Sequence, residues 1–138
     1  MNTYNIIDSS FINSSLYKDF IKANSSNGFL RIRAYSINEA LPIEGLRVVV
    51  STIYNNNKIV FFEGETDSSG LINRIKLPTP ESDTDNLVIP KTINYKIEVF
   101  YDELGLNRTY EVNMYENICV VQNINVPPKT LEVGVLWQ

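Results

Sequence analysis

The sequence predicts an all-β domain, an antiparallel β-sandwich of about seven strands. Short segments alternate apolar and polar side chains, as strands with one buried face do. Turn-forming residues separate these segments, chiefly Asn55–Asn57, Asp67–Gly70 and Asp102–Gly105. One segment, residues 16–23, has the spacing of a short amphipathic helix instead. Strands of this length, separated by turns, are typical of a sandwich.

The segment from Phe61 to Pro78 carries the strongest fold signal. In Asp67-Ser68-Ser69-Gly70, the aspartate can accept from backbone N–H groups two residues on, and the glycine takes a positive φ freely. The apolar runs on both sides predict that this turn closes a β-hairpin at the centre of the domain. After the turn, one face of the expected strand holds Leu71, Asn73, Ile75 and Leu77.

The other expected strands follow from the same alternation. In the first, Leu30, Ile32 and Ala34 face the core while Arg31, Arg33 and Tyr35 form a wet face. Asn55–Lys58 predicts a hairpin turn, since asparagine tolerates the left-handed conformation. The remaining strands are expected over residues 46–50, 59–62, 95–101, 110–114 and 117–126.

Apolar segments flank the expected sandwich, which predicts three parts: an arm with a short helix (1–27), the sandwich (28–127) and a tail (128–138). The helix stripe of Leu16, Tyr17, Phe20 and Ile21 must dock on something, either its own sandwich or a neighbouring subunit. We expect the apolar ends to contact other protein subunits, including copies of the chain. The expected interface residues are Ile6, Ile7, Phe11, Tyr17, Val135, Leu136 and Trp137.

Composition narrows the function classes. A net charge of −4 with 12 basic residues argues against a nucleic-acid partner, and no stretch is long and apolar enough to insert into a membrane. The N-terminus lacks the pattern of a signal peptide, so synthesis in the cytoplasm is expected. The single Cys119 forms no internal disulfide. The 17 asparagines, with abundant Ile and Lys, are typical of AT-rich Firmicutes such as clostridia.

The sequence offers little catalytic chemistry. It has no histidine, which removes the usual nucleophile partner, zinc ligand and general base. Glu63 and Glu65 could form a glycosidase pair, but alternating carboxylates more often solvate a sheet edge. Glu81, Asp83 and Asp85 have calcium-loop spacing without the required glycine and glutamate. We therefore expect no metal, no cofactor and no enzyme activity.

Aromatic residues are the best candidates for ligand contacts. Tyr35, Phe100 and Tyr115 are expected on outward faces and Trp137 lies in the tail. Aromatic rings suit sugar rings and protein interfaces equally well. Candidate sugar-stacking residues are Tyr35, Tyr115 and Trp137.

The order of motifs resembles the carboxypeptidase-regulatory-like, transthyretin-like sandwich family. The resemblance covers residues 28–127 and is closest to versions in clostridial spore-cortex-lytic enzymes and Firmicutes phage-related proteins. It rests on Gly28–Ile32, Ala40–Ile43, Leu46–Val50, Glu65–Leu71, Leu77–Pro80 and Tyr95–Val99. These motifs are turns and strand edges, so they specify a fold rather than an activity. The resemblance implies a non-catalytic module that positions, caps or binds.

Two functions follow as expectations. The first is a non-enzymatic structural or adaptor subunit of a bacterial multiprotein assembly, which docks through its apolar arms. A phage tail or tail-like bacteriocin particle is the leading case, and the spore envelope is the second. The alternative is a carbohydrate- or peptidoglycan-binding module of the spore or cell envelope.

Overall fold

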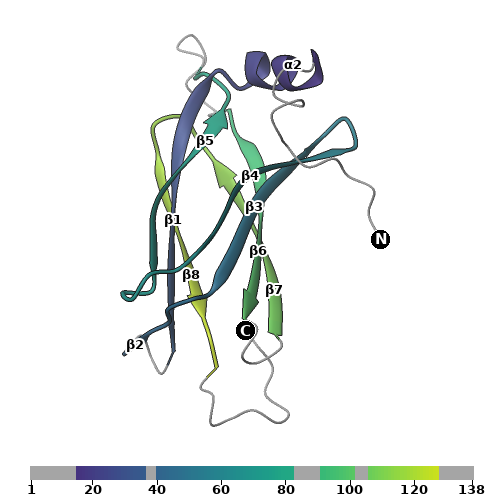
Figure 1. The fold of residues 1–138 in the computed structure, drawn as a ribbon. Helices are drawn as coiled ribbons and strands as arrows, with labels where there is room; N and C mark the ends of the chain where they lie inside the picture. The colour runs from purple at the N-terminus through teal and green to yellow at the C-terminus, as the bar shows by residue number, and fades with distance from the viewer. Residues whose placement is uncertain (1–14, 37–39, 83–90, 102–105, 128–138) are drawn as a thin grey trace.

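The computed structural model describes residues 15–36, 40–82, 91–101 and 106–127 (Figure 1). These residues form one helix and eight strands, of which one has only two residues. In chain order the elements are α2 (Ser15–Ala23), β1 (Ser26–Ser36), β2 (Leu41–Pro42), β3 (Arg47–Tyr54), β4 (Asn57–Glu65), β5 (Leu71–Thr79), β6 (Ile93–Tyr101), β7 (Leu106–Met114) and β8 (Cys119–Asn125). The predicted all-β class of about seven strands is confirmed.

Two sheets face each other and enclose the core (Figure 1). In the first, called here the β1 sheet, β1 is paired with β2, β5 and β8. The second, the β3 sheet, has the order β4-β3-β6-β7 and is antiparallel throughout. β8 runs parallel to β1, from Phe29 opposite Cys119 to Tyr35 opposite Asn125. This parallel pair joins distant parts of the chain, and local sequence patterns do not reveal it.

The core forms where the inward residues of both sheets meet. β1 contributes Leu30, Ile32 and Ala34, as predicted, and all three are buried. Tyr95 of β6 links the sheets, because its hydroxyl donates to the carbonyl oxygen of Pro78 on β5 at 2.6 Å. Burial, with a smaller contribution from Tyr17, raises the pKa of Tyr95. This phenol therefore stays neutral and remains a donor.

The helix docks on its own sandwich. Phe20 is 1% exposed and its ring centroid lies 5.3 Å from that of Tyr54 and 5.6 Å from that of Phe61. Tyr17 lies at the edge of this cluster, 6.5 Å from Phe61 between ring centroids. Leu16 and Ile21 are partly buried, while Lys18 faces solvent. Of the two docking alternatives for the stripe, the structure shows the intramolecular one.

The turn residues are predicted correctly, but the prediction that the Asp67–Gly70 turn closes a central hairpin is wrong. Asn55 and Asn56 take φ values of 49° and 62° and join β3 to its neighbour β4. The turn at Asp67–Gly70 also forms, with the Gly70 N–H donating to the Asp67 carbonyl oxygen at 2.9 Å. However, β4 belongs to the β3 sheet and β5 to the β1 sheet. This turn therefore carries the chain from one sheet to the other.

A bulge in β5 overturns part of the predicted facing. Leu30 pairs with Ile75 and Ile32 pairs with Ile72, so β5 has one residue more than β1 between these pairs. The extra residue reverses the alternation on the N-terminal side of the bulge. Ile75 and Leu77 face the core as expected, but Ile72 packs inward there instead of Leu71.

Glu116 ties together three segments at one end of the β1 sheet. One carboxylate oxygen accepts from the Ser26 hydroxyl at 2.9 Å and the other from the backbone N–H of Ser82 at 2.8 Å. The hydrogen bonds from Ser82, followed by that from Ser26, lower the pKa of Glu116 below its ordinary value of 4.5.

Replacing Glu116 with glutamine is expected to flatten the pH dependence of stability as the pH falls below about 4.5. A carboxylate with a lowered pKa stabilises the fold above its unfolded pKa. That contribution is lost as the pH falls through the folded pKa. Urea unfolding of wild type and E116Q at several pH values measures the effect. Glu111→Gln, at an exposed position on β7, controls for the loss of one charge. A constant difference between wild type and E116Q at every pH would contradict this assignment.

Candidate functional site

The two sheets differ in charge. The strands of the β1 sheet carry four basic side chains, Arg31, Arg33, Arg74 and Lys76, and no acidic one. The strands of the β3 sheet carry four basic and four acidic side chains. The unbalanced charge of the sandwich therefore lies on the β1 sheet.

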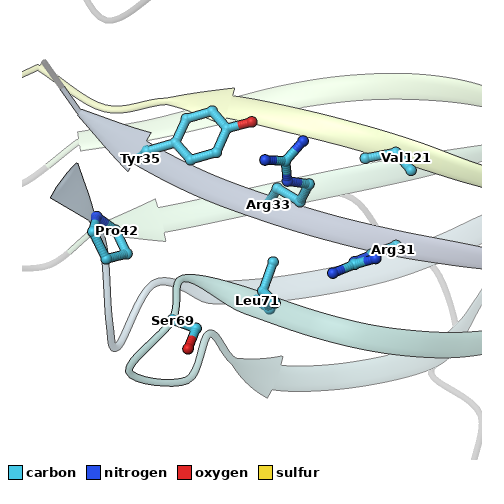
Figure 2. A pocket seen from close by; sticks show the side chains of 7 residues that line it. All are labelled: Arg31, Arg33, Tyr35, Pro42, Ser69, Leu71 and Val121. Atoms are coloured by element: carbon cyan, nitrogen blue, oxygen red, sulfur yellow. The ribbon is translucent and has the colours of Figure 1, made fainter. Parts of the chain in front are cut away.

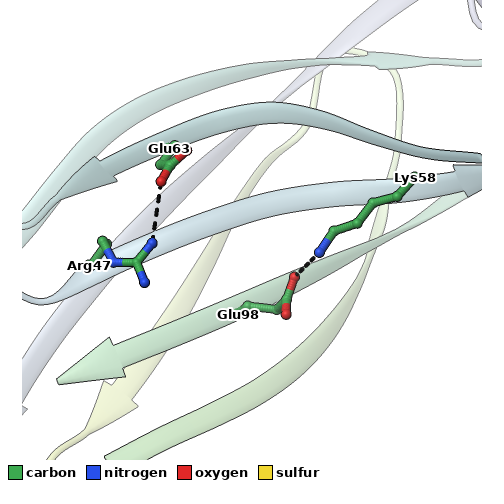
Figure 3. Close-up of polar contacts among 4 residues, drawn as sticks. All are labelled: Arg47, Lys58, Glu63 and Glu98. Atoms are coloured by element: carbon green, nitrogen blue, oxygen red, sulfur yellow. Dashed lines mark hydrogen bonds and ion pairs between the residues drawn. The ribbon is translucent and has the colours of Figure 1, made fainter. Parts of the chain in front are cut away.

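In the part of the chain that the structure describes, ion pairs offset charge on the β3 sheet but not on the β1 sheet. Arg47 pairs with Glu63 at 3.2 Å and Lys58 pairs with Glu98 at 2.7 Å (Figure 3). Glu63 is exposed on the edge strand β4, which agrees with the solvated edge expected for that carboxylate. Within residues 15–36, 40–82, 91–101 and 106–127, no ion pair involves a basic residue of the β1 sheet.

A pocket lies on the outer face of the β1 sheet (Figure 2). Its cavity volume is about 390 Å³, within the range of small-molecule sites. Strands β1, β2, β5 and β8 and the turn before β5 all contribute to it. The lining residues are Arg31, Arg33, Tyr35, Pro42, Ser69, Leu71 and Val121. The lining thus combines two guanidinium groups, two hydroxyls and three apolar side chains.

Arg33 is held in place by its neighbours. Its guanidinium carbon lies 5.0 Å from the centroid of the Tyr35 ring, a cation–π contact. The Tyr35 hydroxyl donates to Oδ1 of Asn123 on β8 at 3.0 Å. Figure 2 shows Arg33 rising beside Tyr35 on the face of β1. The hydrogen bond fixes the ring and the ring fixes the cation, so Arg33 is oriented before any ligand arrives.

Arg31 has an unused donor. Its Nε is buried and has no hydrogen-bond partner among the described residues. A buried donor left without a partner costs about 1–3 kcal/mol. An arginine side chain is always charged, so it cannot relieve this cost by losing a proton.

The turn before β5 forms the rim. Oδ1 of Asp67 accepts from the backbone N–H groups of Ser69 and Leu71 at 2.9 and 3.0 Å. That carboxylate oxygen is thus used within the turn rather than in pairing with an arginine. The Gly70 carbonyl accepts from the Ala34 N–H at 2.8 Å, which holds the rim against β1.

Two of the predicted sugar-stacking residues, Tyr35 and Tyr115, lie far apart, near opposite ends of β1. Tyr35 is 8% exposed, so its expected outward ring is instead largely covered. Tyr115 is half-buried near Gly28, at the opposite end of β1. The seven-residue rise from Gly28 to Tyr35 corresponds to about 23 Å. Trp137 lies outside the described residues, as do the predicted interface residues Ile6, Ile7, Phe11, Val135 and Leu136. Tyr17 packs beside Phe61.

Reasoning from the sequence missed the two pocket arginines, because their alternation with Leu30 and Ile32 is also that of any solvated strand face. A usable signal was present: residues 26–36, 71–79 and 119–125 include no acidic residue, while four basic ones lie among them. Only the strand order shows that these three segments share a sheet.

The described residues hold no group of three or more Cys, Asp or Glu side chains placed to bind a metal ion. No helix among them is long and apolar enough to cross a membrane.

Comparison with known proteins reveals the fold class. No family model and no curated protein sequence matches the chain. Its structure is similar to that of 5-hydroxyisourate hydrolase from Klebsiella pneumoniae, with a TM-score of 0.52 and 14% sequence identity. The similarity covers 73% of this chain and 90% of that chain. The chain therefore has a transthyretin-like β-sandwich fold, as the sequence motifs predicted.

The same comparison corrects one prediction. We expected no enzyme activity, because the sequence has no histidine and resembles a family of non-catalytic modules. The similar structure is a hydrolase, so the fold carries enzymes as well and that expectation is overturned. A likeness at 14% identity establishes the shared fold and assigns no reaction to this chain.

Proposed function

We propose that the chain is a subunit of a bacterial multiprotein assembly, with a phage tail or tail-like bacteriocin particle as the leading case. The sandwich serves as the rigid body, and strand β8 together with the apolar terminal segments contacts neighbouring subunits. The finished location is then the assembled particle. A spore envelope is the second setting.

The edge strand β8 is the observation that supports this proposal most directly. Among the described residues β8 pairs with no strand except β1, so within that part of the chain its other side is a sheet edge. β8 carries no charged residue and no proline, whereas the edge strands β4, β5 and β7 each carry at least two charges. Charges and prolines are the usual protection of an edge against pairing with other chains. An edge without them suits the addition of a strand from a partner.

Exposed apolar side chains beside that edge agree with an interface. Ile118 is 49% exposed just before β8 and Val121 is 46% exposed within it. From the sequence, Ile6, Ile7, Phe11, Leu136 and Trp137 add apolar surface at the two ends of the chain. Each such side chain contributes about 1.5–3 kcal/mol when it is buried. An assembly that covers them gains that stabilisation.

Replacing Ile118 with lysine is expected to reduce incorporation into particles several-fold while the isolated chain still folds. A lysine at this exposed position places a charge beside the edge that a partner strand would use. Particles sedimented from the producing bacterium and probed for the tagged chain give the measurement. The matched control is Ile53→Lys, since Ile53 is 47% exposed on the β3 sheet. Equal incorporation of both variants would argue against β8 as the interface.

Deleting residues 1–13 and 129–138 tests the contribution of the terminal segments independently of β8. Incorporation should fall while the thermal unfolding of the shortened chain stays cooperative. Normal incorporation of the shortened chain would contradict the proposal that the terminal segments contact neighbouring subunits.

A cell-wall glycan module is the second candidate. Its support is the pocket beside Tyr35, which offers hydroxyl and guanidinium donors of the kind that bind sugar oxygens. A pull-down on purified cell walls discriminates between the two candidates. If the chain at micromolar concentration were not retained on the cell walls, the glycan-binding candidate would be rejected.

A further inference from the structure

We infer that the pocket on the outer face of the β1 sheet binds a small organic acid, through a carboxylate that sits between Arg31 and Arg33. This inference does not rest on the proposed assembly role. Its starting point is the combination of two cations and an apolar lining in one cavity of about 390 Å³.

The charge of the pocket indicates an anion. Arg31 and Arg33 occupy outward positions two residues apart on β1, and neither pairs with an acid among the described residues. Asp67, which belongs to the turn that forms the rim, uses Oδ1 for two backbone N–H groups of that turn. Arginine binds carboxylates through parallel N–H bonds that are shorter and stronger than neutral ones. Both Arg31 and Arg33 line the cavity, so both can contribute donors of this kind.

The apolar lining selects the kind of anion. Leu71 on β5 and Val121 on β8 flank the arginines, and Pro42 closes one end (Figure 2). A bare inorganic ion would leave these three side chains without a contact. A carboxylate on an aliphatic or aromatic body fills both parts of the lining. The hydroxyls of Tyr35 and Ser69 lie on the same cavity, where they can contact polar atoms of the ligand.

The site is also pre-organised. The Tyr35–Asn123 hydrogen bond fixes the ring on which Arg33 rests. The Asp67 turn fixes Ser69 and Leu71. Side chains fixed before binding lose little conformational freedom when the ligand arrives.

Benzoate is the probe for the test, with benzyl alcohol as its uncharged counterpart and inorganic phosphate as the anion without an apolar body. Binding is followed by chemical-shift changes of the backbone amides in the ¹⁵N-labelled full chain at 150 mM salt. Benzoate is expected to bind saturably and to shift the amides of Arg33, Leu71 and Val121. Benzyl alcohol and phosphate should bind at least about tenfold more weakly, since benzyl alcohol lacks the negative charge and phosphate lacks the apolar body.

Variants assign the binding to the two arginines. Arg31→Met and Arg33→Met keep the apolar stem and remove the charge, and each should lower benzoate affinity about tenfold or more. Arg74→Met is the matched control, because Arg74 lies on β5 outside the pocket with its guanidinium carbon 3.9 Å from the Phe29 ring centroid. It should change the affinity less than about twofold.

Three outcomes would overturn the inference. They are equal binding of benzyl alcohol or phosphate, unchanged benzoate binding in the Arg31→Met, Arg33→Met double variant, and an equal loss in Arg74→Met. A blocked Leu-Glu-Leu peptide distinguishes the source of the carboxylate. Tighter binding of the peptide than of benzoate supports the site and assigns it to an acidic side chain of a protein.

Discussion

Replacing Phe20 with alanine is expected to lower the free energy of unfolding by about 3–5 kcal/mol. Phe20 is 1% exposed and contacts Tyr54 of β3 and Phe61 of β4 through its ring. The helix has nine residues, too few to be stable without packing. Loss of the ring therefore removes both the buried area and the anchor that holds α2 to the sandwich. Urea unfolding followed by fluorescence and circular dichroism gives the measurement.

The same helix offers its own controls. Phe20→Leu keeps an apolar side chain at the site and should cost clearly less than the alanine variant. Lys18→Ala alters the solvent face and should change stability by less than about 0.5 kcal/mol. If Phe20→Ala cost no more than Lys18→Ala, the helix would not be packed on the sandwich as described.

Local chemistry explains why so much of the fold was predictable. Alternation over a few residues placed Leu30, Ile32 and Ala34 in the core. The positive φ values of Asn55, Asn56 and Gly70 fall where asparagine and glycine had indicated turns. Each of these inferences needs only neighbours in sequence, and the structure agrees with each of them.

The errors arise where the outcome depends on distant partners. The turn at Asp67–Gly70 was correct, but whether β4 and β5 pair depends on β3 and β1, which bind them on different sheets. The bulge that reverses the facing of Leu71 appears only in the register against β1. That reversal directs Leu71 into the pocket beside Arg33. A strict alternation assigned it to the core.

The candidate site was hidden for the same reason. Its residues come from segments separated by up to about ninety positions, from Arg31 to Val121. In sequence, each arginine is an ordinary solvated residue of one strand. The site exists because β8 pairs parallel to β1 and brings Val121 opposite Arg31. Chemistry that depends on such pairing cannot be read from spacing along the chain.

Replacing Gly70 with alanine is expected to cost about 1.5–3.5 kcal/mol of folding stability and to disturb the pocket as well. Gly70 has a φ of 75°, which costs an L-residue about 1–2 kcal/mol. A Cβ atom there would also collide with the carbonyl oxygen of Ala34 and come within 3.1 Å of the Ile43 nitrogen. Because both are backbone atoms, the turn must move away from β1. The Ala34–Gly70 hydrogen bond, worth about 0.5–1.5 kcal/mol, is then lost.

Gly45 provides a matched control for the two parts of this cost. Its φ is 81°, but a Cβ atom there would meet nothing within 4 Å. Gly45→Ala should therefore lose only the conformational part, about 1–2 kcal/mol. The difference between the two variants in chemical unfolding measures the contact of the turn with β1. Equal losses would show that the turn is not pressed against that strand. Because Ser69 and Leu71 flank Gly70, only the Gly70 variant should also weaken benzoate binding.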